Sequence, residues 1–176
     1  MADDGGGATR RRGAPDRVVA FTDGVFAIVI TILVLEVGVP PDLPERPLQE
    51  AIVQTGPELV AWVISFLLVG MYWVWHRDLF AGIRYVNRDV VWLNLLFLLP
   101  TSLIPFAASV LDEYPREAIA LRLYGLVLIA AALLRFALYA YLMRRPELLW
   151  NTPSHRRRRI GGLLALAPVA VYLVAI

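Results

Sequence analysis

The chain has 176 residues, of which 59% are hydrophobic and only 18% are charged, a composition too apolar for a water-soluble domain of this size. It contains no cysteine, which excludes disulfides, thiolate metal sites and cysteine nucleophiles. Its net charge of +2 comes from arginines at the ends of apolar segments, so the charge predicts membrane topology rather than a nucleic-acid partner.

The composition predicts an all-α integral membrane protein with a short tail and one membrane domain. Residues 1–17 are rich in Gly, Asp and Arg, which predicts a disordered cytoplasmic tail. Residues 18–176 are expected to form a single transmembrane helical domain, because the connections between apolar segments are too short to fold alone. Five spanning helices are expected, over about residues 18–37, 58–76, 89–111, 117–143 and 160–176.

The first apolar segment, residues 18–37, is expected to be a membrane anchor rather than a signal peptide, because no small-residue cleavage site follows it. Asp23 lies about one turn inside this helix, where an unpaired carboxylate would cost on the order of 2–3 kcal/mol. Two interpretations follow: Asp23 has a buried partner, or the helix dipole and interfacial water stabilise it in the first turn.

A helical wheel of this segment places five residues on one narrow, mostly apolar stripe: Gly24, Ile28, Thr31, Ile32 and Leu35. Asp23 falls about 140° away from Ile28 around the helix. Taken alone, this spacing favours ordinary helix packing, with Gly24 permitting the close approach of a neighbouring helix.

The later segments contain a few polar residues that are expected to be structural. His76 ends the second helix among aromatic residues, a grouping typical of a membrane interface. Asn94 can hydrogen-bond across helices, and Arg135 can extend toward the cytoplasmic edge. Pro100 and Pro105 predict a kink in the third helix, where nearby hydroxyls can bond the freed carbonyls.

The distribution of arginines predicts the orientation. Thirteen arginines lie in the tail and the two connections on its side of the membrane, whereas the opposite connections contain only Arg46 and Arg116. Because arginine is enriched on the cytoplasmic side, we expect a plasma-membrane protein with a cytoplasmic N-terminus and an acidic outer face.

Catalysis is not expected from this chain. It has no recognisable catalytic or metal-binding motif, and its only histidines are His76 and His155. We therefore expect no enzyme activity, no metal site and no cofactor.

Several motifs in the first 110 or so residues point to a known family. They are Arg17-x-x-x-Phe21-Thr22-Asp23-Gly24-Val25-Phe26-Ala27-Ile28 with Thr31 and Leu33-Val34-Leu35-Glu36, then Tyr72-Trp73-x-x-His76, Asn94-Leu95-Leu96-Phe97-Leu98 and Pro105-Phe106. This set resembles prokaryotic members of the transmembrane protein 175 family of potassium channels. The family usually has serine where this chain has Thr22, a conservative exchange of one hydroxyl for another.

The resemblance implies a homotetramer in the lipid bilayer whose first helices line a central pore for potassium ions, with no cofactor. It implies an apolar constriction at Ile28, further rings at Ile32 and Leu35, and a hydroxyl layer at Thr31 that favours potassium. The family pattern has six helices, so the sixth is either truncated or lost here. A polar network of Arg17, Thr22, Asp23, His76 and Asn94 is expected to hold the first helix against its neighbours.

The expected function is that of a potassium-permeable cation channel with modest selectivity over sodium. One alternative is a proton-conducting channel. A proton-coupled secondary transporter would instead use Asp23, His76 and Arg135 as a relay, although no inverted repeat supports it. A non-conducting membrane scaffold, in which the stripe is packing, is the third possibility.

Overall fold

The computed structural model describes residues 14–37, 47–151, 156 and 161–163. In this part of the chain the elements are α1 (Asp16–Ile32), η1 (Leu33–Glu36), α2 (Leu48–Gln54), α3 (Gly56–Ala81), α4 (Arg88–Ser102), α5 (Ile104–Glu113), α6 (Ala118–Met143) and η3 (Pro146–Leu148). Four stretches are long and apolar enough to cross a membrane, namely Asp16–Leu35, Gly56–Ala81, Arg88–Glu113 and Ala118–Met143. They correspond to the first four expected helices, while most of the fifth, residues 160–176, lies outside the described residues.

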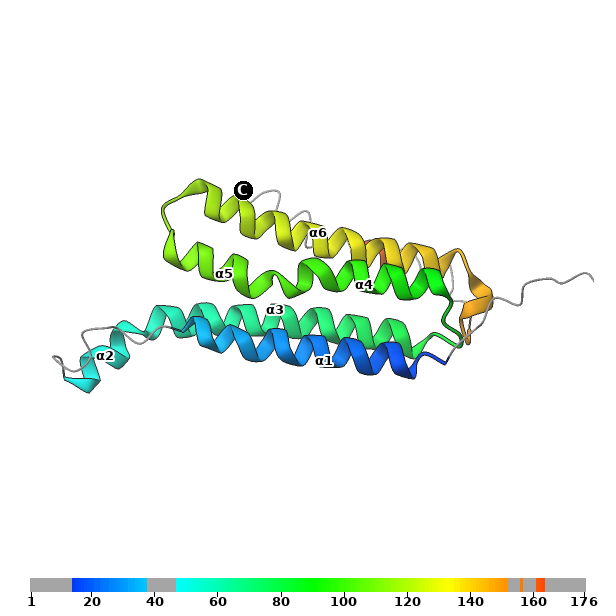
Figure 1. The fold of residues 1–176 in the computed structure, drawn as a ribbon, viewed down its shortest axis with the longest axis horizontal. Helices are drawn as coiled ribbons and strands as arrows, with labels where there is room; N and C mark the ends of the chain where they lie inside the picture. Colours follow the sequence, from blue (N-terminus) through cyan, green and yellow to red (C-terminus); the bar gives the residue numbers. More distant parts are fainter. Residues whose placement is uncertain (1–13, 38–46, 152–155, 157–160, 164–176) are drawn as a thin grey trace, which may run out of the picture.

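The four long stretches run alternately in opposite directions and form an antiparallel bundle (Figure 1). Within it, α1 packs against α3 and α4, and both α4 and α5 pack against α6. One cluster of the core forms around Phe26, Tyr72 and Phe97, and a second forms around Phe80 and Leu142. The bundle therefore has a packed interior of its own and leaves its remaining apolar side chains on the outside.

Two features differ from the sequence expectations. The first helix begins at Asp16 rather than Val18, because a carboxylate in the first turn is favoured by the positive end of the helix dipole. Residues 1–13 of the expected tail lie outside the described part. The short helix α2 was not expected, because seven residues are too few to give a clear helical periodicity.

The predicted kink of the third segment is confirmed as a break at Leu103, between α4 and α5. The Leu103 N–H donates to the carbonyl of Pro100 at 3.1 Å, which deprives the Leu99 carbonyl of its usual helical donor. The Ser102 hydroxyl donates to that Leu99 carbonyl at 2.8 Å. The break therefore leaves this backbone oxygen satisfied in an apolar setting.

Charged side chains divide between the two ends of the bundle. The start of α1 and the end of α3 lie at one end, where exposed arginines outnumber carboxylates, and we call it the basic end. Its arginines include Arg17, Arg77, Arg84, Arg88, Arg144 and Arg145. The opposite or acidic end carries Glu58, Asp112, Glu113 and Glu117, with Arg116 beside them.

Candidate functional site

The predicted stripe lies on the face of α1 and η1 that the bundle does not cover. Ile28 is 59% exposed, Ile32 40% and Leu35 77%, and Gly24 and Thr31 are also exposed. The opposite face of the same helix is buried through Phe26, Val29 and Leu33. One side of the first helix thus builds the core, and the stripe faces away from it.

Gly24 is not used for close packing inside the described bundle. A Cβ atom added at Gly24 would meet no described atom outside its own helix within 4 Å. The interpretation that Gly24 admits a neighbouring helix therefore finds no support among the described residues, which leave the stripe exposed.

Thr31 supplies the one hydroxyl of the stripe. Its Oγ1 lies 2.9 Å from the carbonyl oxygens of both Ala27 and Ile28, to which it can donate its proton within the helix. A hydroxyl that donates in this way keeps oxygen lone pairs for another partner. Thr31 is therefore the polar acceptor in a surface otherwise made of Ile28, Ile32 and Leu35.

Three of the five expected network residues meet in the core. The Asn94 amide Nδ2 donates to Thr22 Oγ1 at 2.8 Å, and Asn94 Oδ1 lies 2.8 Å from His76 Nε2. Because the amide oxygen is an acceptor, this bond requires a hydrogen on His76 Nε2. Thr22, Asn94 and His76 are nearly completely buried. Their chain of hydrogen bonds joins α1, α4 and α3 at one level of the bundle.

Aromatic rings surround the imidazole of His76. It stacks on Phe80 with a centroid distance of 4.1 Å, and the rings of Phe97 and Phe26 lie at 6.1 and 6.3 Å. Its second nitrogen, Nδ1, has no hydrogen-bond partner among the described residues. His76 is thus held in the interior of the bundle by one hydrogen bond and by ring packing.

Asp23 forms a separate contact. Its Oδ1 accepts a hydrogen bond of 2.8 Å from the indole Nε1 of Trp73 on α3, so the half-buried carboxylate has a partner. Within the described part of the chain, no hydrogen bond joins Asp23 to His76 or Asn94. Arg17 is exposed in the first turn of α1, and no described hydrogen bond or ion pair joins it to the other four residues.

Sequence reasoning did not assign two aromatic contacts on α3. Trp73, the partner of Asp23, was interpreted only as an interfacial ring, since nothing local relates it to α1. Arg135 is buried within the bundle, and its guanidinium lies 4.2 Å from the centroid of Trp75 and 5.9 Å from that of Tyr72. Aromatic faces therefore stabilise this charge, and the arginine does not extend along the surface to the basic end.

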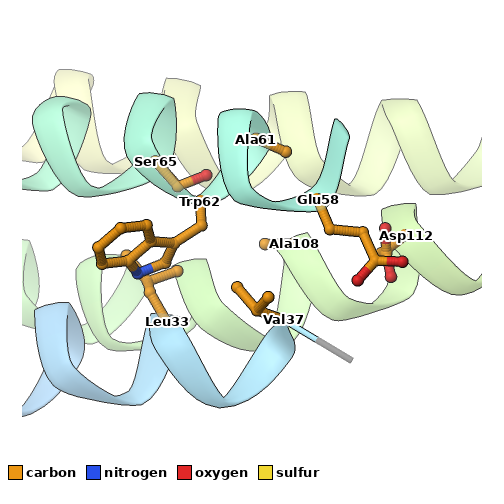
Figure 2. A pocket seen from close by; sticks show the side chains of 8 residues that line it. All are labelled: Leu33, Val37, Glu58, Ala61, Trp62, Ser65, Ala108 and Asp112. Atoms are coloured by element: carbon orange, nitrogen blue, oxygen red, sulfur yellow. The ribbon is translucent and has the colours of Figure 1, made fainter. Parts of the chain in front are cut away.

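A small cavity of about 50 Å³ lies at the acidic end, between η1, α3 and α5. Figure 2 shows the carboxylates of Glu58 and Asp112 directed toward the same space, while the indole of Trp62 lies over Leu33. No group of three or more His, Cys, Asp or Glu side chains that could hold a metal ion occurs among the described residues. The cavity thus brings two carboxylates together at the acidic end of the bundle.

Comparisons with known proteins agree with this arrangement. A family model described as endosomal/lysosomal potassium channel TMEM175 matches residues 17–105. A potassium channel of Streptomyces collinus is 38% identical over 151 residues, which are 82% of this chain and 73% of that protein. The human endosomal/lysosomal proton channel TMEM175 is 37% identical over 110 residues, which are 58% of this chain and 22% of the human protein.

A solved structure is also similar. The crystal structure of a lysosomal potassium-selective channel TMEM175 homolog from Chamaesiphon minutus matches with a TM-score of 0.68 and 28% sequence identity, over 90% of this chain and 86% of that one. Sequence, family model and fold thus agree over the helices that carry the stripe and the polar contacts. The chain belongs to the TMEM175 family, a family of ion channels and not of enzymes.

Proposed function

We propose that the protein is a potassium-permeable cation channel of the plasma membrane, in which four copies of the chain place their first helices around a central pore. The observation that carries the proposal is the uncovered stripe of Ile28, Thr31, Ile32 and Leu35 on the side of α1 that faces away from the core. The names of the prokaryotic relative and of the structural neighbour, both potassium channels, support the choice of ion.

The pore requires several copies because a single bundle is filled with side chains. Phe26, Tyr72, Phe97 and their neighbours occupy the interior, so ions have no path between the helices of one subunit. A surface stripe that repeats around a symmetry axis encloses a channel without disturbing that core. The exposed position of Gly24, with no described atom of another element near its Cβ site, leaves room for a neighbouring subunit.

The chemistry of the stripe sets the expected properties of the pore. Rings of Ile28, Ile32 and Leu35 offer no oxygen to replace the hydration shell of a cation, so a narrow ring closes the pore by dewetting. One layer of Thr31 hydroxyls supplies a few acceptor oxygens. Selectivity for potassium over sodium is therefore expected to be modest compared with that of a filter made of carbonyl rings.

The orientation with a cytoplasmic N-terminus follows from the positive-inside rule, which places the basic end in the cytoplasm. The acidic end, with Glu58, Asp112, Glu113 and Glu117, then faces outward, on the same side of the membrane as the Leu35 end of the stripe. Carboxylates at a pore mouth raise the local concentration of cations. Residues 18–176 act as one membrane domain in this proposal, and residues 1–17 precede it.

Proton conduction is the second candidate. The human relative is named a proton channel, and Asp23 is a titratable residue that precedes Gly24 in the sequence of the first helix. In the described chain, however, the Asp23 carboxylate accepts a hydrogen bond from Trp73 on α3. A proton would also have to pass the apolar ring proposed at Ile28, which lies further along the same helix. A coupled transporter is less well supported, because the described residues contain no hydrogen-bond chain linking Asp23, His76 and Arg135.

The test is ion flux into liposomes containing the purified protein, with potassium, sodium and protons measured separately. Wild type is compared with Ile28→Asn, and with Ile64→Asn as the matched control, because Ile64 on α3 is also 59% exposed. The proposal predicts a larger flux of both potassium and sodium for Ile28→Asn and an unchanged flux for Ile64→Asn. A folded wild-type protein that passes no ions would favour the scaffold instead.

A further inference from the structure

A second feature lies at the basic end, away from the stripe. A cavity of about 500 Å³ opens between the start of α1, the end of α3 and the segment that follows α6. Arg77 and Arg84 contribute its positive charge, and Asp16 is the carboxylate that lines it. Its apolar lining includes Val19 and Phe80. The cavity thus combines a basic edge with apolar walls at the level where the helices end.

Both guanidinium groups are positioned by aromatic rings. Arg84 lies 4.8 Å from the ring centroid of Tyr85 and 5.3 Å from that of Trp150, and Arg77 lies 5.8 Å from that of Trp73. A guanidinium over a ring face keeps its in-plane N–H groups available for a planar or tetrahedral oxyanion. The ion pair of Arg77 with Asp78 is long, at 3.6 Å, and exposed. Asp78 therefore competes only weakly with a bound oxyanion for the Arg77 guanidinium.

Backbone pairing fixes the position of Trp150. Ile83 and Leu149 form an isolated antiparallel bridge, in which Trp150 N donates to the Gly82 carbonyl at 3.0 Å and Arg84 N donates to the Leu148 carbonyl at 2.7 Å. Ile83 and Leu149 are buried, whereas the Trp150 side chain is 63% exposed. The indole of Trp150 is therefore held next to Arg84 on the surface and is not buried.

We propose that this cavity binds the headgroup phosphate of an anionic phospholipid through Arg77 and Arg84. Tryptophan exposed at the ends of spanning helices is typical of the membrane–water interface, where headgroups lie. Basic pockets between spanning helices bind anionic headgroups by charge complementarity. The apolar walls at Val19 and Phe80 fit the glycerol and upper acyl region of a lipid. A free phosphate ion would leave this apolar part of the cavity empty.

The site joins the first turn of α1 to α3. The lipid contacts elements that hold the stripe-bearing helix at the basic end, yet it lies on a different surface from Ile28, Ile32 and Leu35. Its binding can therefore be measured without measuring ion flux, and the result does not depend on whether the stripe conducts.

The experiment is native mass spectrometry of delipidated protein in detergent, after addition of phosphatidylglycerol or of phosphatidylcholine with the same acyl chains. Wild type is compared with the double variant Arg77→Gln/Arg84→Gln and with Arg144→Gln. Arg144 is exposed at the same end but does not line the cavity, so it controls for loss of charge alone. Circular dichroism and elution volume establish that each variant is folded.

The proposal predicts that wild type and Arg144→Gln retain phosphatidylglycerol in preference to phosphatidylcholine, and that the double variant weakens that preference about tenfold. If the double variant does not fold, Arg84→Gln alone is expected to lose a substantial part of the preference for phosphatidylglycerol. Equal retention of the two lipids by wild type overturns the proposal, as does an equal loss in Arg144→Gln. Displacement of the lipid by millimolar inorganic phosphate identifies an anion site that does not recognise lipid, and overturns it too.

Discussion

The carboxylate of Asp23 on α1 accepts a hydrogen bond of 2.8 Å from the indole of Trp73 on α3, 50 residues further along the chain. This contact gives the carboxylate of Asp23, in the middle of the stripe-bearing helix, a polar partner. It also fixes the rotation of α1, because Asp23 lies on the opposite side of the helix from Ile28. The stripe therefore faces outward partly because Asp23 is held inward.

Removing the Trp73 donor is expected to destabilise the protein more than removing the Asp23 charge. Trp73→Phe leaves a half-buried carboxylate without its donor, at an expected cost of about 1.5–3 kcal/mol of unfolding free energy. Asp23→Asn keeps an acceptor oxygen for the indole, so a loss of about 1 kcal/mol or less is expected. Denaturant unfolding in detergent measures both. A larger loss in Asp23→Asn than in Trp73→Phe would contradict this account.

The hydrogen bond between Thr22 and Asn94 is expected to couple α1 to α4 energetically. In a double-mutant cycle of Thr22→Val and Asn94→Leu, the coupling energy should be about 0.6 kcal/mol and at most about 1.7 kcal/mol, as for other hydrogen bonds between membrane helices. Thr22→Val combined with Thr101→Val is the control, because Thr101 bonds the carbonyl of Phe97 in its own helix. The effects of these two control substitutions on the free energy of unfolding should be additive. A coupling energy of zero between Thr22 and Asn94 would contradict the hydrogen bond in the structure.

The hydroxyl of Thr31 is expected to determine what selectivity the pore has. Thr31→Val replaces the oxygen with a methyl group of similar size, so the ratio of potassium to sodium permeability should fall toward one. Thr31→Ser keeps the oxygen and should retain the ratio. Reversal potentials under bi-ionic conditions measure it. An unchanged ratio in Thr31→Val would place the selectivity elsewhere.

The hydroxyl of Tyr141 is expected to stabilise the basic end of the bundle. It donates to Asp89 Oδ2 at 2.6 Å and accepts from Asn87 Nδ2 at 2.8 Å, linking α6 to the start of α4. Tyr141→Phe should lower the free energy of unfolding by about 1–3 kcal/mol, because two polar groups lose a partner. Tyr114→Phe, at an exposed tyrosine of the acidic end, is the control and should change it little.

The parts of this structure that depend on local geometry could be predicted from the sequence. The stripe of Ile28, Ile32 and Leu35 follows from helical periodicity, which is fixed once the segment is known to be a helix. The break near Pro100 and Pro105 follows from the missing backbone donors. Its position at Leu103 does not, since it depends on which carbonyls the neighbouring hydroxyls can reach.

Contacts between distant segments could not be predicted in this way. Asp23 was expected in one polar network with Arg17, Thr22, His76 and Asn94. Its described hydrogen-bond partner, Trp73, lies one helical turn before His76 on the same element and was not expected. Helical periodicity shows on which face of its own helix a residue lies. It does not show how the neighbouring helix is rotated, and so which of that helix's residues the first one meets. For Arg135 the sequence left open an extension toward the cytoplasmic edge, whereas in the structure Trp75 and Tyr72 offer its guanidinium aromatic faces within the bundle.

The central claim is that the exposed face of α1 and η1 lines an ion pathway, and cysteine accessibility tests it most directly because the natural chain has no cysteine. Leu35→Cys lies at the end of the stripe near the acidic end of the bundle, which the proposed orientation places outside. Leu67→Cys on α3 is an exposed apolar control that is not part of the stripe. A cationic methanethiosulfonate added outside reconstituted liposomes is expected to modify Leu35→Cys and reduce potassium flux strongly, while Leu67→Cys keeps its flux. If Leu35→Cys is not modified, or is modified without a loss of flux, the first helix does not line the pathway.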